Sequence, residues 1–142
     1  MRKKPQSRSA FLQKRVKKTK LRYLGLSTID LFGIQIPVYT DLDAMKADAI
    51  ALGCHREDVD FKMAAAGLTL HFHTSGVPVI MLWIEDPNAY SVIAHEAVHC
   101  ADFIMESIGI SHELGSTETR AYLVGHIFDD VADIFENTQP NE

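Results

Sequence analysis

The sequence predicts an α+β domain, in which a few strands are combined with two long helices. Residues 68–86 contain two apolar, strand-like runs that are separated by Ser75 and Gly76, as in a β-hairpin. Two amphipathic segments follow, at about 87–108 and 117–135, and each is bounded by residues that start and end helices. The chain therefore combines both element types within one short domain.

The part of the chain before the hairpin adds a strand and a short helix. Residues 30–41, DLFGIQIPVYTD, carry β-branched and aromatic residues with one Pro, which is typical of an edge or first strand. Residues 41–53 are expected to form a short helix with an Asp at its start and Gly53 at its end. Residues 79–84 form a nearly continuous apolar run, which predicts a strand buried on both faces.

Composition bounds the class of protein. At 142 residues, with 46% hydrophobic and 23% charged residues, the chain has the size and balance of one globular domain. Two cysteines give no disulfide framework, so we expect a reducing, intracellular setting. No apolar run has the length of a membrane span and no signal peptide opens the sequence, so we expect no membrane contact and a cytoplasmic location.

Charge is distributed very unevenly. Ten of the fourteen Lys and Arg residues lie in residues 1–22, which contain no Asp or Glu, whereas all nineteen acidic residues lie in 23–142. We therefore expect a basic, flexible arm at 1–22 and one domain at 23–142. The arm is interpreted as a solubilising tail or a segment lying on the acidic domain. The alternatives are contact with nucleic acid or another acidic partner through residues 2–22, and a cleaved organellar presequence.

The first long helix carries the pentapeptide HEAVH at residues 95–99. Residues four apart share a helix face, so the imidazoles of His95 and His99 are expected to project from the same side, as two zinc ligands must. Glu96 lies about 100° round the helix from His95, where it can reach a water molecule without being a ligand. The spacing therefore predicts a zinc site on this helix.

A catalytic zinc site requires a third protein ligand. The candidates downstream are His112, Glu113 and Glu118. Glu118 is preferred because it starts the second long helix, whose polar stripe is expected to face that of the first. Gly125 lies beside this stripe and is expected to let the two helices approach closely. His112, in the connection between the helices, is the main rival.

Three segments of the chain resemble a known family. They are AAGLTLHFHTSGVPVIMLWI, AHEAVHCADF and ETRAYLVGHI. They are similar to the small zincin-like metallopeptidase domains encoded by tailed bacteriophages, in which a glutamate ligand completes the HExxH motif, and more distantly to the ImmA/IrrE-type zincins. The resemblance covers residues 64–128, about half of the chain. It implies a minimal zincin-like domain, with a small mixed sheet packed on an active-site helix and on a second helix that carries the third ligand.

The resemblance also implies a function. The chain would be a zinc-dependent hydrolase, a metallopeptidase that acts on a protein or peptide substrate. One Zn²⁺ per chain would be bound by His95, His99 and Glu118, with Glu96 as the general base that activates the attacking water.

One position departs from the wider family. Thermolysin-like enzymes have an Asp one turn after the glutamate ligand, where it orients a histidine, and Tyr122 occupies that position here. Asp102 is the alternative residue for this supporting role.

Peptide hydrolysis also needs a donor for the developing oxyanion and a surface that holds the substrate. Tyr122, His126 and His73 are the candidate donors, in that order. In zincins an extended substrate commonly pairs with the edge strand before the active-site helix. Residues 79–84 lead into that helix, but their apolar character favours another strand as the exposed edge.

Two alternatives remain open. The chain could be a non-catalytic, metal-stabilised phage virion or host-interaction protein, because metal-binding free energy also stabilises a fold. It could also be a peptidase tethered to nucleic acid through its basic arm. The corresponding locations are the host-cell cytoplasm or the virion, and the sequence carries no prediction of oligomeric state.

Overall fold

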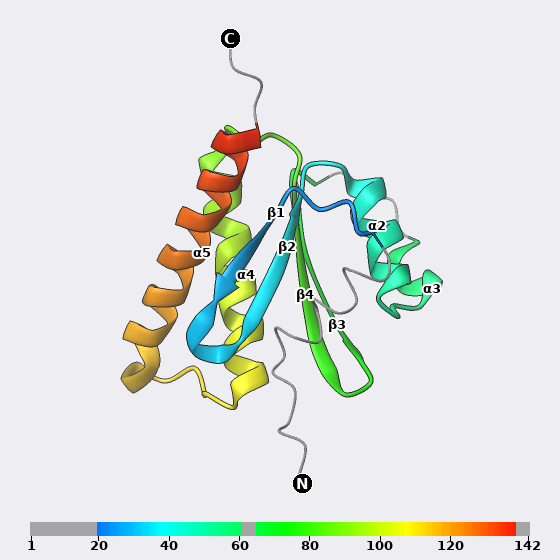
Figure 1. Cartoon of the computed structure of the whole chain (residues 1–142). Helices are drawn as coiled ribbons and strands as arrows, with labels where there is room; N and C mark the ends of the chain where they lie inside the picture. Colours follow the sequence, from blue (N-terminus) through cyan, green and yellow to red (C-terminus); the bar gives the residue numbers. More distant parts are fainter. Residues whose placement is uncertain (1–19, 61–64, 139–142) are drawn as a thin grey trace, which may run out of the picture.

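A computed structural model describes residues 20–60 and 65–138 and confirms the α+β class (Figure 1). Its centre is a four-stranded sheet in the order β1-β2-β4-β3. The strands are β1 (Gly25–Ile29), β2 (Ile34–Tyr39), β3 (Gly67–Thr74) and β4 (Val77–Ile84). β1 and β2 are antiparallel, β2 and β4 parallel, and β3 and β4 antiparallel. The sheet is therefore mixed, and β3 forms one of its two edges.

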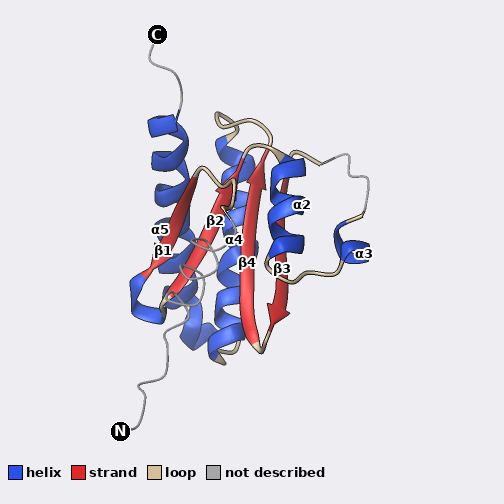
Figure 2. Ribbon diagram, turned by 45° about the vertical axis from the view of Figure 1, so that its right-hand side comes forward, coloured by secondary structure: helices blue, strands red, loops and turns tan. Residues whose placement is uncertain are grey.

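Helices cover both faces of the sheet. They are α2 (Leu42–Ala51), α3 (Arg56–Val59), α4 (Tyr90–Ile108) and α5 (Thr117–Thr138). Figures 1 and 2 show α4 and α5 side by side on one face and the two shorter helices on the other. Two 3-10 turns, η1 (Asp30–Phe32) and η2 (Leu114–Ser116), precede β2 and α5. The motif helix α4 thus lies over the β3–β4 half of the sheet, and α5 over β1.

Strand β4 is buried on both faces, as its apolar run predicts. Ile80 and Leu82 belong to the core beneath α4 and α5. Met81 and Trp83 belong to the core beneath α2. The expected hairpin between β3 and β4 is also confirmed, because its turn residues Ser75 and Gly76 both have positive φ, at 51° and 74°.

One sequence expectation near the start of the domain is wrong. β2 is neither an edge nor a first strand, because β1 precedes it and β2 pairs with both β1 and β4. Its proline, Pro37, is tolerated since the pairing of β2 with β4 begins only at Val38, after the position that lacks an N–H group. The helix expected at 41–53 is present as α2. Its N-cap is the predicted Asp41, whose side chain accepts hydrogen bonds from the N–H groups of Asp43 and Ala44.

The chain enters the domain along the α2 side of the sheet. The carboxylate of Asp48 is buried and accepts hydrogen bonds from the backbone N–H of Arg22 at 2.7 Å and from the hydroxyl of Tyr39 at 2.6 Å. Burial and the Asp48 carboxylate raise the pKa of Tyr39 well above its usual value, so Tyr39 stays a neutral donor. Most of the arm predicted at 1–22 lies outside the described residues, so its role stays a prediction.

None of the helices in the described part of the chain has the length and apolar character of a membrane span.

Candidate metal centre

The two histidines of the pentapeptide meet at the surface of α4. Their side chains are exposed, and the Nε2 atoms of His95 and His99 lie 3.2 Å apart, with the rings edge to face. The rigid turn of helix between them fixes this separation, because residues four apart are neighbours on one helix face. The prediction that both imidazoles project from the same side of the helix is confirmed.

The distance between these nitrogens fits zinc. Two imidazole ligands with Zn–N bonds of about 2.0–2.1 Å in a tetrahedral arrangement have their nitrogens about 3.3 Å apart. The pair at 3.2 Å therefore presents two donors at the separation that one tetrahedral ion requires. At the same distance two neutral rings can also share one proton, so the geometry alone admits both states.

The histidines border a groove between α4 and the edge strand β3. Its volume is about 670 Å³. The residues that line it are Ala65, Ala66, Gly67, Leu68, Thr69, Ser91, Val92, His95, Glu96, His99 and Phe103. Most of these are apolar or small, and the polar side chains among them are those of Thr69, Ser91, His95, Glu96 and His99. An apolar cleft with a few converging polar groups is the usual form of a small-molecule or substrate site.

The narrow contact between β3 and α4 depends on Gly67. A Cβ atom at this position would lie 2.8 Å from Cγ1 of Val92 and 3.0 Å from Cγ of Glu96. A side chain at Gly67 would therefore push the strand away from the helix.

Gly125, which was expected to allow the close approach of two helices, has no atom within 4 Å of a Cβ built on it, so that expectation is wrong.

Glu96 is a buried carboxylate beside the histidine pair. Its side chain is 6% exposed, and its Oε2 accepts a hydrogen bond from the hydroxyl of Thr69 on β3 at 2.6 Å. Sequence reasoning did not identify Thr69. The available signal was the alternation of side chains along β3. Leu68, Leu70 and Phe72 pack towards α2, so the residues between them, Thr69 included, face α4.

Behind the groove, Cys100 is fully buried on α4. Burial raises the pKa of its thiol to about 12, so the group is neutral at ordinary pH. Its Sγ lies 3.8 Å from Oγ1 of Thr69. The thiol therefore acts as a packing group and has no nucleophilic character.

The third ligand is not grouped with the histidines. Among residues 20–60 and 65–138, no cluster of three or more His, Cys, Asp or Glu side chains is arranged to hold a metal ion. Glu118 lies in the first turn of α5 and is exposed, as are His112 and Glu113 in the connection before it. The assignment of Glu118 as ligand therefore stays a prediction.

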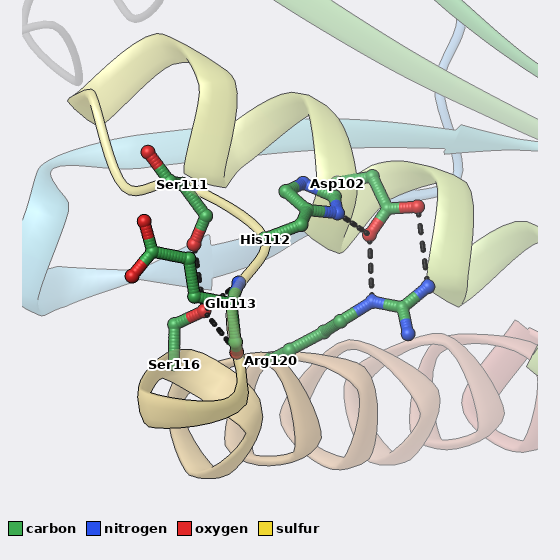
Figure 3. Close-up of polar contacts among 6 residues, drawn as sticks. All are labelled: Asp102, Ser111, His112, Glu113, Ser116 and Arg120. Carbon is green, nitrogen blue, oxygen red and sulfur yellow. Dashed lines mark hydrogen bonds and ion pairs between the residues drawn. The ribbon is translucent and has the colours of Figure 1, made fainter.

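Asp102, the alternative supporting residue for a ligand histidine, is bound elsewhere (Figure 3). Its carboxylate accepts hydrogen bonds from Nε and Nη2 of Arg120 on α5, at 2.8 and 3.3 Å. His112 Nδ1 lies 3.9 Å from the same carboxylate. Asp102 thus connects α4 to α5 and to the loop between them.

Tyr122 and His126 lie over the opposite edge of the sheet. His126 Nε2 is 2.8 Å from the carbonyl oxygen of Thr28 on β1 and 3.2 Å from Oδ2 of Asp130, and the ring of Tyr122 stacks on it at 5.9 Å. The hydroxyl of Ser27 also donates to Asp130, at 2.8 Å. The structure therefore uses His126 to attach α5 to β1 and does not bring these two candidate donors to the groove.

His73, the third candidate donor, lies on β3 beside His71. The ring of His71 is 5.1 Å from that of His73 and 4.5 Å from that of Phe103 on α4. Nε2 of His71 is buried without a hydrogen-bond partner among the described residues, and burial, together with His73, lowers the pKa of His71. The expectation that both histidines point to one side of the strand is confirmed.

Comparison with protein-family models, curated proteins and solved structures gives no match. The resemblance to zincin-like domains therefore stays a prediction.

Proposed function

We propose that this chain is a zinc-dependent hydrolase, a metallopeptidase whose general base is Glu96. One observation carries the proposal. Two imidazole nitrogens lie 3.2 Å apart on one helix, and the buried carboxylate of Glu96 borders the same groove. A purely structural zinc site has no use for a carboxylate between its two histidines, whereas a hydrolytic site needs one to move a proton.

His95 and His99 would hold the ion. The third ligand would come from the first turn of α5 or from the connection before it. Glu118 is proposed for this position, on the resemblance to zincin-like domains, and His112 and Glu113 are its rivals. Zinc bound there would polarise the scissile carbonyl and make water a stronger acid. A Zn²⁺ ion bound by two neutral imidazoles and one carboxylate would have a net positive charge.

Glu96 performs the proton transfer in this proposal. Its carboxylate accepts a proton from the attacking water, and the same group then returns the proton to the nitrogen of the departing amine. The covalent balance is that of hydrolysis: the C–N bond breaks, a C–O bond forms, and the proton moves from water to the amine. The base therefore lies against a largely apolar wall of the groove.

The substrate is proposed to be an extended peptide that pairs with β3. β3 is an edge strand, so one side of its backbone has no neighbouring strand in the described sheet. Such an edge can add a peptide as a further strand. It also borders the groove that contains Glu96, so a peptide paired with β3 would pass along the histidines.

The proposal is tested by hydrolysis of a mixed peptide library by the zinc-loaded protein. We expect cleavage by the wild type and a loss of about 10²–10⁴-fold in kcat for Glu96→Gln, with zinc content unchanged. Glu106→Gln is the matched control, because Glu106 lies on the same helix but is exposed and does not line the groove. Retained cleavage by Glu96→Gln would overturn the role of the base. Bound zinc without any cleavage would favour the non-catalytic, metal-stabilised alternative.

A further inference from the structure

We propose that Thr69 is a positioning residue that holds the carboxylate of Glu96 in the orientation required for proton transfer. This inference rests on the proposed function and extends it to the edge strand. Nothing in the HExxH motif requires a threonine at this place, and Thr69 is 27 residues distant from Glu96 in the chain.

The geometry assigns the direction of the hydrogen bond. Oγ1 of Thr69 lies 2.6 Å from Oε2 of Glu96 and 3.2 Å from the backbone carbonyl oxygen of the same residue. Both of these oxygens are acceptors, so the hydroxyl must donate, and the shorter distance identifies the carboxylate as its main partner. A hydroxyl that donates to an ionised carboxylate forms one of the stronger classes of hydrogen bond.

The burial of Glu96 makes its carboxylate depend on the hydrogen bond from Thr69. Glu96 is 6% exposed, and a buried carboxylate without a donor is strongly disfavoured. The bond from Thr69 occupies Oε2 and thereby fixes the rotation of the carboxylate about its last side-chain bond. The other oxygen of the carboxylate is then the one that can accept a proton from water in the groove.

The strand that carries Thr69 is itself held in register. Thr69 pairs with Leu82 of the central strand β4, and two residues earlier Gly67 packs closely against Val92 of α4. The backbone of Thr69 therefore cannot move away from Glu96 without displacement of β3, and only rotation about χ1 of Thr69 can withdraw the hydroxyl. Since β3 is also the strand proposed to pair with the peptide, Thr69 connects the substrate-binding edge to the base.

Three single variants and a Glu96→Leu background test this inference. Thr69→Val removes the hydroxyl at nearly constant shape, Thr69→Ser keeps it, and Thr74→Val makes the same isosteric change at the far end of β3, outside the groove. The first measurement is the thermal midpoint of the metal-free proteins. We expect Thr69→Val to lower it by about 3–8 °C, and to lower it much less in a Glu96→Leu background, because no buried carboxylate is then left without its donor.

The second measurement is kcat and KM of the zinc-loaded proteins on the cleaved peptide. We expect Thr69→Val to lower kcat by about 10–100-fold, with KM and zinc content little changed, and Thr69→Ser to restore most of kcat. A merely structural threonine would not separate kcat from KM in this way. Thr74→Val is expected to match the wild type in both measurements.

The outcomes separate the two proposals. Wild-type kcat in Thr69→Val would overturn the positioning role. If Thr69→Val destabilised the wild type and the Glu96→Leu variant equally, the hydrogen bond between Thr69 and Glu96 would be overturned as well. A wild type that binds no zinc and cleaves no peptide would overturn the proposed function and with it the catalytic role of Thr69. The metal-free stability cycle would still decide whether Thr69 and Glu96 interact.

Discussion

Gly67 on β3 and Val92 on α4 are so close that a Cβ atom on the glycine would lie 2.8 Å from Cγ1 of the valine. The same Cβ would lie 3.2 Å from the backbone carbonyl oxygen of Trp83, which cannot rotate away as a side chain can. The absence of a side chain at Gly67 therefore sets the distance between the edge strand and the motif helix, and with it the width of the groove.

We predict that Gly67→Ala destabilises the protein by about 1–3 kcal/mol, because the added methyl group overpacks the contact between β3 and α4. Urea unfolding measures this effect. The matched control is Gly125→Ala on α5, where nothing lies within 4 Å of the new Cβ. It should stabilise the protein by about 0.5–1 kcal/mol, because alanine favours a helix interior more than glycine does. Equal effects of the two changes would contradict the packing described for β3.

The fold could be predicted from sequence where local patterns determine it. The run at 79–84 and the turn at Ser75 and Gly76 identified β4 and the hairpin, and the 3.6-residue period identified α4 and α5. β1 was missed because its five residues, GLSTI, are short and largely small or polar. They form a strand because they pair with β2 and lie against α5, about a hundred residues later in the chain.

The candidate site could likewise be predicted only where local geometry determines it. The positions of His95, His99 and Glu96 relative to one another follow from helix geometry alone. Thr69 could not be found, because its contact depends on how an edge strand is placed against the helix. The sequence also could not show which way α5 is rotated about its axis, and this rotation places His126 over β1 and away from α4.

The buried carboxylate of Asp48 provides a second prediction. Tyr39→Phe removes the hydroxyl that donates to it at 2.6 Å and leaves the backbone N–H of Arg22 as donor. We expect a loss of about 1–3 kcal/mol in the free energy of unfolding, because a buried acceptor loses a partner. Tyr90→Phe at an exposed position should change stability by less than about 0.5 kcal/mol. A Tyr39→Phe variant as stable as the wild type would show that water replaces the lost donor.

The lowered pKa of His71 predicts a pH dependence of stability. Burial and the neighbouring His73 lower this pKa in the folded state, against an opposing effect of Glu106, from about 6.5 in the unfolded chain. The unfolded chain therefore binds more protons than the folded protein below about pH 6.5, so stability falls as the pH falls from that value towards the folded-state pKa.

His71→Leu removes this titration and should flatten the curve of unfolding free energy against pH between about 5 and 7. The measurement uses metal-free protein, so that proton release at the zinc site does not contribute. The same slope in the variant as in the wild type would show that the acid sensitivity arises from other groups.

The most direct test of the central claim is the zinc content of the purified, metal-reconstituted protein, measured by elemental mass spectrometry. We predict about one zinc per chain in the wild type, and its loss in His95→Ala and in His99→Ala while both variants remain folded. Loss in Glu118→Ala would identify the third ligand, and retention there would assign that position to His112 or Glu113. A folded wild type that takes up no zinc would contradict the assignment of the histidine pair as a metal centre.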